Sequence, residues 1–279
     1  MTQGEQKHMT ERSPQAPDAN AIYVYAVCRA ELPVDLDGVT GVAQEEPVRS
    51  LTFGSLTAIV QSVRSAEFTD EAWQERLTDE AELERYARAH HAVVSAVAAQ
   101  APTVPLPLAT LYNGPDRARH ALDAESVRFH TALRRVAHHA EWGVKVYAPA
   151  SPGSRAAAAP PRPGAPAGQD RPAPGAGRAY LDRKRNLRTE REQRQEESLR
   201  VAEAVDAHVS RIAKASRRLR PHGQGAAGDH RVQVLNATYL VAEDRSGELD
   251  LLARSLREQT GAQIEVSGPW VPYSFVGEV

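Results

Sequence analysis

Residues 79–148 decide the fold, from DEAELERYARAHHAVVSAVA (79–98) at the start to EWGVKVYA (141–148) at the end. In the first segment, apolar residues recur at steps of three and four, which places them on one side of a helix. The residues on that side are Leu83, Tyr86, Ala87, His90, Val94, Val97 and Ala98. A helix with one apolar side must cover another element, so we expect it to pack on a sheet.

Between these two segments, the sequence predicts an irregular edge element and then a second helix. TVPLPLAT (103–110) is largely apolar, but its prolines lack backbone donors, which restricts it to the edge of a sheet. The helix is expected to begin after Gly114 and Pro115, because proline suits a first helical turn. Its inward residues would be Ala118, Leu122, Phe129, Leu133, Val136 and Ala140. The chain then enters EWGVKVYA (141–148), which has the character of a buried strand that completes the same sheet.

The residues before this stretch supply the rest of the predicted sheet. IYVYAVC (22–28) is crowded with β-branched and aromatic residues, as in a central strand that is buried on both faces. Residues 48–53 and 56–63 predict a hairpin, and Thr69 is the expected N-cap of a short helix. This order predicts a small α+β sandwich, in which helices cover one face of a mixed sheet. A rearranged ferredoxin-like domain is the candidate arrangement.

The second half of the chain predicts a linker and a smaller α/β layer. Residues 149–177 are rich in Pro, Ala and Gly and lack large apolar side chains, so they predict a flexible linker or insertion. Residues 178–220 show the longest helical pattern. A strand at 232–241, a helix at 246–259 and a strand at 262–267 follow, and an aromatic tail ends the chain.

The long predicted helix has two different halves. Its second half carries a narrow apolar seam, as in a coiled coil or helical hairpin: Leu199, Ala202, Val205, Val209, Ile212, Ser216 and Leu219. The first half mixes arginines with glutamates three and four residues apart, which is typical of a solvated or protein-docking helix. A nucleic-acid arm would instead show uncompensated basic charge interleaved with aromatic residues.

These patterns divide the chain into four parts. We expect a disordered arm at 1–20, an N-terminal α+β domain at 21–148, the linker at 149–177 and a smaller C-terminal α/β domain at 178–279. The C-terminal part would contain the long helix, the strand-helix-strand unit and the aromatic tail. In that tail, Trp270, Tyr273 and Phe275 carry too much apolar area to be left in water, so we expect them to be buried.

Composition excludes several classes of protein. The 279 residues carry 36 acidic and 34 basic side chains, so the net charge of −2 creates no global field for nucleic acid or an anionic membrane. The single cysteine, Cys28, lies in an apolar run and predicts a small buried side chain. The N-terminus lacks the apolar core of a signal peptide, and no apolar run is long enough to span a bilayer. The expected location is therefore the cytoplasm.

No catalytic, cofactor-binding or metal-binding residue is predicted. The sequence contains no nucleotide-binding glycine loop, no hydrolase elbow and no zinc pattern. Among the ten histidines, His90 lies on an apolar helix side, where a satisfied core histidine is expected, and His138 and His139 lie at a predicted helix end. The chemistry of the sequence therefore favours an interaction protein.

Four motifs together resemble the GvpF/GvpL family of gas vesicle accessory proteins. They are His90-His91, TVPLPLATLY (103–112), EWGVKVYA (141–148) and GPWVPYSF (268–275), in the family's order and over nearly the whole chain. This sequence departs from the family's pattern at three places. Val271 stands where proline is commoner in the family, and a long interruption follows Ala148. Pro107-Leu108-Ala109 stands where a basic residue, an aromatic residue and a glycine are commoner in the family.

The resemblance implies an α+β N-terminal domain related to the ferredoxin arrangement and a non-enzymatic role in vesicle nucleation or assembly. Its implied partners are the small hydrophobic shell protein and other accessory proteins. The candidate residues for structural or partner-binding roles are Trp142, Trp270, Tyr273 and Phe275. We expect Trp270 to lock the tail onto the protein, the alternative being that it anchors a partner. The alternative function is a small-molecule-binding or catalytic ferredoxin-like protein.

Overall fold

The computed structural model describes residues 20–147, 176–220 and 232–277. The described residues divide into an N-terminal unit that ends at residue 137 and a C-terminal unit that begins at residue 138. The predicted arm at 1–20 and linker at 149–177 lie outside the described residues, apart from Asn20 and residues 176–177. In the described part of the chain, no helix is long and apolar enough to cross a membrane.

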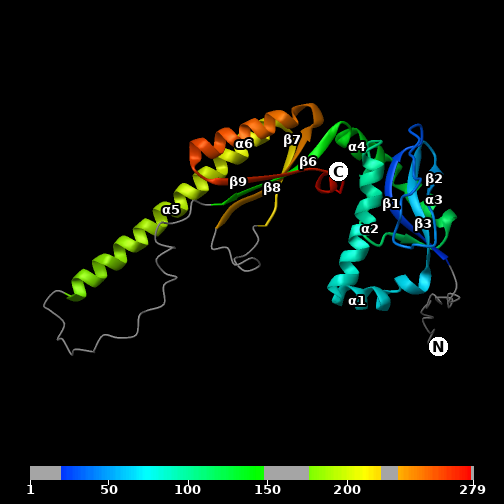
Figure 1. The fold of residues 1–279 in the computed structure, drawn as a ribbon, viewed down its shortest axis with the longest axis horizontal. Helices are drawn as coiled ribbons and strands as arrows, with labels where there is room; N and C mark the ends of the chain where they lie inside the picture. Colours follow the sequence, from blue (N-terminus) through cyan, green and yellow to red (C-terminus); the bar gives the residue numbers. More distant parts are fainter. Residues whose placement is uncertain (1–19, 148–175, 221–231, 278–279) are drawn as a thin grey trace, which may run out of the picture. The chain divides into compact units, whose positions relative to one another are not determined.

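The N-terminal unit is built on an antiparallel sheet with β1 at its centre (Figure 1). Its strands are β1 (Asn20–Arg29), β2 (Val48–Phe53), β3 (Leu56–Arg64), β4 (Val104–Pro105) and β5 (Leu111–Tyr112). Its helices are η1 (Ser65–Phe68), α1 (Asp70–Thr78), α2 (Glu80–Ala98), α3 (Pro115–Ala124) and α4 (Ser126–Val136). The predicted central strand, hairpin, α2 and irregular edge element are confirmed.

Helices cover both faces of this sheet, whereas the sequence predicted helices on one face. The ring of His90 on α2 contacts Tyr23 and Tyr25 of β1, on the face that also carries Gln61. On the opposite face, Phe53 of β2 contacts Phe129 of α4. Coverage on both sides explains why residues 21–28 of β1 are all buried. The rearranged ferredoxin-like arrangement stays a prediction.

The C-terminal unit contains a four-stranded antiparallel sheet with the order β7-β8-β6-β9. Its strands are β6 (His139–Tyr147), β7 (Ala213–Arg218), β8 (Gln233–Ala242) and β9 (Gln263–Trp270). Its helices are α5 (Ala176–Ile212), η2 (Glu243–Arg245), α6 (Ser246–Thr260) and η3 (Tyr273–Phe275). Helices α5 and α6 pack together on one face of the sheet (Figure 1). The predicted strands at 232–241 and 262–267 and the helix at 246–259, which ends at left-handed Gly261, are confirmed.

The placement of β6 corrects the predicted boundary at residue 148. The segment EWGVKVYA (141–148) was expected to complete the N-terminal sheet, but β6 pairs with β8 and β9 and belongs to the C-terminal unit. The preceding helix is also shorter than predicted, because the chain turns at His138, whose φ is 59°. Ala140 therefore lies on the strand and not on the helix.

The long helix ends at Ile212 and not at 220. Residues 213–218 form β7, an edge strand that pairs with β8, so Ser216 lies on a strand and Leu219 follows it. The carboxylate of Asp206 on α5 fixes this corner, because it accepts hydrogen bonds from Tyr239 Oη (2.6 Å) and Arg218 Nε (2.9 Å). A charge-assisted contact of this kind ties α5 to the sheet more strongly than a neutral hydrogen bond would.

Candidate partner-binding site at the C-terminal aromatic segment

The C-terminal segment, residues 268–276, lies close over the start of β6. A Cβ atom added at Gly268 would lie 2.9 Å from the carbonyl oxygen of Glu141 and 2.9 Å from Cε3 of Trp142. The φ of Gly268 is 138°, a conformation that side chains with a Cβ rarely adopt. Glycine is therefore required where the segment passes over Trp142.

The carboxylate of Glu141 anchors the far end of the segment. Oε1 accepts a hydrogen bond from Ser274 Oγ at 2.6 Å, and Oε2 accepts one from the Ser274 backbone N–H at 2.9 Å. Glu141 is 6% exposed, so these bonds replace most of the hydration of its charge. Arg217 on β7 donates to the Ser274 carbonyl at 3.4 Å. These contacts hold the backbone of the segment in one position.

The aromatic residues of the segment divide into a buried group and an exposed pair. Phe275 and Trp142 are 4% and 8% exposed, whereas Trp270 and Tyr273 are 51% and 38% exposed. The expectation of burial is confirmed for Phe275 and wrong for Trp270 and Tyr273. Trp270 pairs with Glu141 across the strands, and the carboxylate of Glu141 is hydrogen-bonded to Ser274.

A buried polar network in the N-terminal unit joins Tyr23 of β1, His90 of α2 and the edge segment at Ala109. The hydroxyl of Tyr23 accepts a hydrogen bond from Ala109 N–H (3.1 Å) and forms a second hydrogen bond with His90 Nδ1 (3.0 Å), whose direction depends on the histidine tautomer. Burial lowers the pKa of His90 to about 4, partly offset by the Leu106 carbonyl, and raises the pKa of Tyr23 to about 12. Both groups are neutral at pH 7, and they hold the proline-rich edge segment on β1.

A second buried network fixes the loop before β2. Gln61 Nε2 donates to the carbonyls of Ala43 (2.7 Å) and Glu46 (2.5 Å), and its Oε1 accepts from Tyr25 Oη at 2.5 Å. A Cβ atom at Gly41 would lie 2.3 Å from Tyr25 Oη, so the loop requires glycine at that position. Every polar atom in this network bonds within the fold, which indicates a structural role.

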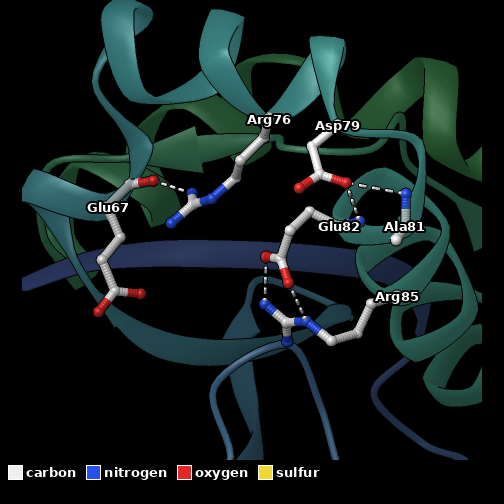
Figure 2. Close-up of polar contacts among 6 residues, drawn as sticks. All are labelled: Glu67, Arg76, Asp79, Ala81, Glu82 and Arg85. Atoms are coloured by element: carbon white, nitrogen blue, oxygen red, sulfur yellow. Dashed lines mark hydrogen bonds and ion pairs between the residues drawn. The ribbon is translucent and has the colours of Figure 1, made fainter.

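The corner between α1 and α2 is likewise stabilised by local polar contacts (Figure 2). Asp79 Oδ1 caps α2 by accepting from the N–H groups of Ala81 (3.0 Å) and Glu82 (3.2 Å). Glu82 and Arg85 form a forked ion pair, and the hydrogen bond from Arg85 lowers the pKa of Glu82. Arg76 donates to the Glu67 carbonyl and lies over the ring of Tyr86. These groups satisfy one another, so they define a corner and not a ligand site.

Metal-binding geometry is missing from the part of the chain that the structure describes. Within residues 20–147, 176–220 and 232–277, no group of three His, Cys, Asp or Glu side chains is close enough to hold a metal ion. Cys28 is buried, and burial raises the pKa of its thiol to about 11. The thiol is therefore protonated at pH 7 and a weak nucleophile.

A comparison with protein families assigns the chain. The model of the gas vesicle synthesis protein GvpL/GvpF family matches residues 21–277. This chain belongs to the GvpL/GvpF family. It therefore has a role in gas vesicles, and the predicted family resemblance is confirmed.

Relatives of known sequence and structure agree with this assignment. The GvpL/GvpF chain is 37% identical over 255 residues to gas vesicle protein L of Streptomyces sp. (strain CB03234), covering 91% of this chain and 92% of that protein. Its fold is similar to crystal structures of GvpF from Microcystis aeruginosa (TM-score 0.61, 14% identity, 92% of this chain and 99% of that one) and from Anabaena sp. PCC7120 (0.56, 13%, 94% and 98%). At these identities, the structures support the fold alone.

In this GvpL/GvpF protein, the structure brings Trp142 and Trp270 to the start of β6 and adds Glu141 and Ser274, which anchor the segment that carries Tyr273 and Phe275. Trp142 lies against Gly268, and Phe275 follows the anchored Ser274, while Trp270 pairs with Glu141 across the strands. Sequence reasoning missed the anchor between Glu141 and Ser274. The available signal was that each belongs to a motif, EWGVKVYA and GPWVPYSF, and that one of them is a carboxylate at the start of a buried strand.

Proposed function

We propose that this chain is a non-enzymatic assembly factor that acts in nucleation or growth of the gas vesicle by binding the small hydrophobic shell protein. Membership of the GvpL/GvpF family supports the gas vesicle role. Other gas vesicle accessory proteins are the further proposed partners. The binding surface that we propose is Trp270 with Tyr273.

The observation that carries this proposal is the exposure of Trp270 on an anchored backbone. Exposed tryptophans in a monomer mark interaction sites more often than chance, because the ring offers a large apolar area that loses little entropy on binding. Trp270 is 51% exposed, yet the segment that carries it is fixed through Ser274 to the buried Glu141. A rigid aromatic group of this kind suits an apolar partner.

The test is co-expression with the major shell protein, followed by pull-down at low and high salt. We expect wild-type binding to survive high salt, because apolar contacts are not screened. Trp270→Ala should abolish capture. Leu251→Ala is the matched control, because Leu251 is also exposed, at 62%, and lies in the same unit on α6.

Two results would contradict the proposal. Capture by Trp270→Ala at the wild-type level would show that this ring is not the docking group. Capture of wild type that disappears at high salt would show that the contact is chiefly electrostatic. Loss of capture together with a large drop in unfolding midpoint would instead favour the locking role that the sequence suggested.

A further inference from the structure

The N-terminal half of α5 extends away from the core of its own unit. Among the α5 side chains that the structure describes, the first that is buried in that core is Val201. Figure 1 shows this half of the helix passing beyond α6 and the sheet. At 1.5 Å per residue, residues 176–200 span about 37 Å. A helix of this length without a packed side needs another source of stability.

One side of this helix carries a regular pattern, which we call the α5 stripe. Its residues follow one another at steps of three and four, and all are exposed: Leu181, Lys184, Arg188, Glu192, Glu196 and Leu199. At 3.6 residues per turn, the stripe is rotated by roughly 110° from the side that carries the buried Val205 and Val209. The α5 stripe therefore faces away from the packing of its own unit.

The stripe is symmetric about Glu190, with the sign of the charge reversed. Leu181 and Leu199 are equally distant from Glu190, as are Lys184 and Glu196, and Arg188 and Glu192. In an antiparallel pair of identical helices centred on this residue, each basic side chain of one copy lies opposite an acidic side chain of the other. Each leucine lies opposite a leucine. Self-complementarity of this kind is what a two-fold interface between identical chains requires.

Contacts within one helix do not account for the whole pattern. Arg188 and Glu192 form an ion pair at 2.8 Å within α5, and Arg200 pairs with Glu196 at 2.7 Å. Such pairs stabilise a solvated helix. They do not explain why leucines stand at both ends of the stripe, where each is 52% exposed. A second copy would bury both leucines and would place the Arg188–Glu192 pair beside the same pair of its partner.

We infer that α5 is a dimerisation helix, and that it binds α5 of a second copy of this chain in an antiparallel, two-fold arrangement. The contact joins Lys184 to Glu196 and Arg188 to Glu192 between copies, with Leu181 against Leu199 at each end. Exposed ion pairs contribute little individually and are screened by salt. The dimer is therefore moderate in affinity and weaker at high salt. This inference does not depend on the proposed contact with the shell protein.

Charge-sorted variants test the register directly. In the full-length protein, Lys184→Glu with Arg188→Glu makes the stripe acidic throughout, and Glu192→Lys with Glu196→Lys makes it basic throughout. Analytical ultracentrifugation from about 1 to about 100 µM protein at low salt should show each variant alone as a monomer. A one-to-one mixture should form a heterodimer, because every charged position is then complementary. The wild type should dimerise by itself.

The control places the same charge change on the opposite side of α5. Glu190→Lys with Glu197→Lys alters exposed residues outside the stripe and should dimerise like the wild type. Circular dichroism checks that every variant keeps its helix content. Leu181→Ala with Leu199→Ala should keep the fold, since both side chains are exposed, but should weaken dimerisation at least about tenfold.

The inference is overturned if the wild type remains monomeric over this concentration range at low salt. It is also overturned if the acidic and basic variants each dimerise alone, or if their mixture contains only monomers. Equal loss of dimer in the control variant would show that total charge, and not the α5 stripe, determines association.

Discussion

At the residue scale, Ala109 shows where backbone conformation conflicts with residue type. Its φ is 60°, a left-handed value that costs a residue with a Cβ about 1–2 kcal/mol, and its N–H donates to Tyr23 Oη. Ala109→Gly should therefore raise the free energy of unfolding by about 0.5–1 kcal/mol after the greater chain entropy of glycine is included. Denaturant titration measures this change.

The matched control is Ala92→Gly, at an exposed and ordinary helical position in α2. This change should lower the free energy of unfolding by about 1 kcal/mol. If both variants are destabilised alike, strain at Ala109 is not relieved by glycine and the conformational account is wrong.

The lowered pKa of His90 makes the stability of the N-terminal unit depend on pH. Its pKa is about 4 in the folded protein and about 6.5 in the unfolded chain, so the unfolded chain binds more protons between these values. Stability from this group is complete above pH 6.5 and is lost as the pH falls towards 4, by on the order of 3 kcal/mol. The unfolding free energy of wild type should therefore fall faster between pH 6.5 and 4.5 than that of His90→Leu. Parallel curves for the two proteins would show that His90 is not the responsible group.

At the scale of elements, different residues of the C-terminal segment anchor it and stand exposed: Ser274 anchors the segment, and Trp270 is exposed to solvent. Ser274→Ala leaves Glu141 Oε1 without its 2.6 Å hydrogen bond in a buried position, which should cost about 1–3 kcal/mol. Trp270→Ala removes a half-exposed ring and should change stability by less than about 1 kcal/mol. Thermal unfolding of both variants beside wild type measures the contrast. A larger loss for Trp270→Ala than for Ser274→Ala would restore the locking role that the sequence alone suggested.

Helices and strands with local sequence signals could be predicted from the sequence, whereas strands that depend on distant partners could not. α2, the β2–β3 hairpin and α6 depend on local signals, such as the N-cap Asp79, the Gly54 turn and the left-handed Gly261, and all were placed correctly. β6 has a clear strand pattern, but its partner β8 lies far along the chain, so the sheet to which it belongs could not be read locally. Nor could β7, whose short polar sequence continues the charged pattern of the helix before it.

The candidate site was predicted in composition but not in geometry. The motif GPWVPYSF identified the aromatic residues, and the apolar area of Trp270 favoured burial. The anchor of the segment is a contact between Ser274 and Glu141, which lie far apart in sequence. Periodicity and propensity carry no information about such a contact.

At the scale of the whole molecule, this GvpL/GvpF family protein consists of two compact units. The C-terminal unit carries both proposed interaction surfaces, namely the exposed pair Trp270 and Tyr273 and the α5 stripe. A dimer that presents this pair twice would bind a polymerising partner with higher avidity than a monomer. Loss of dimerisation should then weaken capture of assembled shell protein more than capture of single shell subunits.

Gas vesicle formation tests the proposed docking surface in cells that carry a complete set of gas vesicle genes, with this chain replaced by its Trp270→Ala, Tyr273→Ala double variant. The measurement is the turbidity that is lost when pressure collapses the vesicles, and Leu251→Ala serves as the control. We expect the double variant to accumulate and melt like wild type but to yield few vesicles. Vesicles at the wild-type amount would contradict the claim that the exposed aromatic pair is the docking surface.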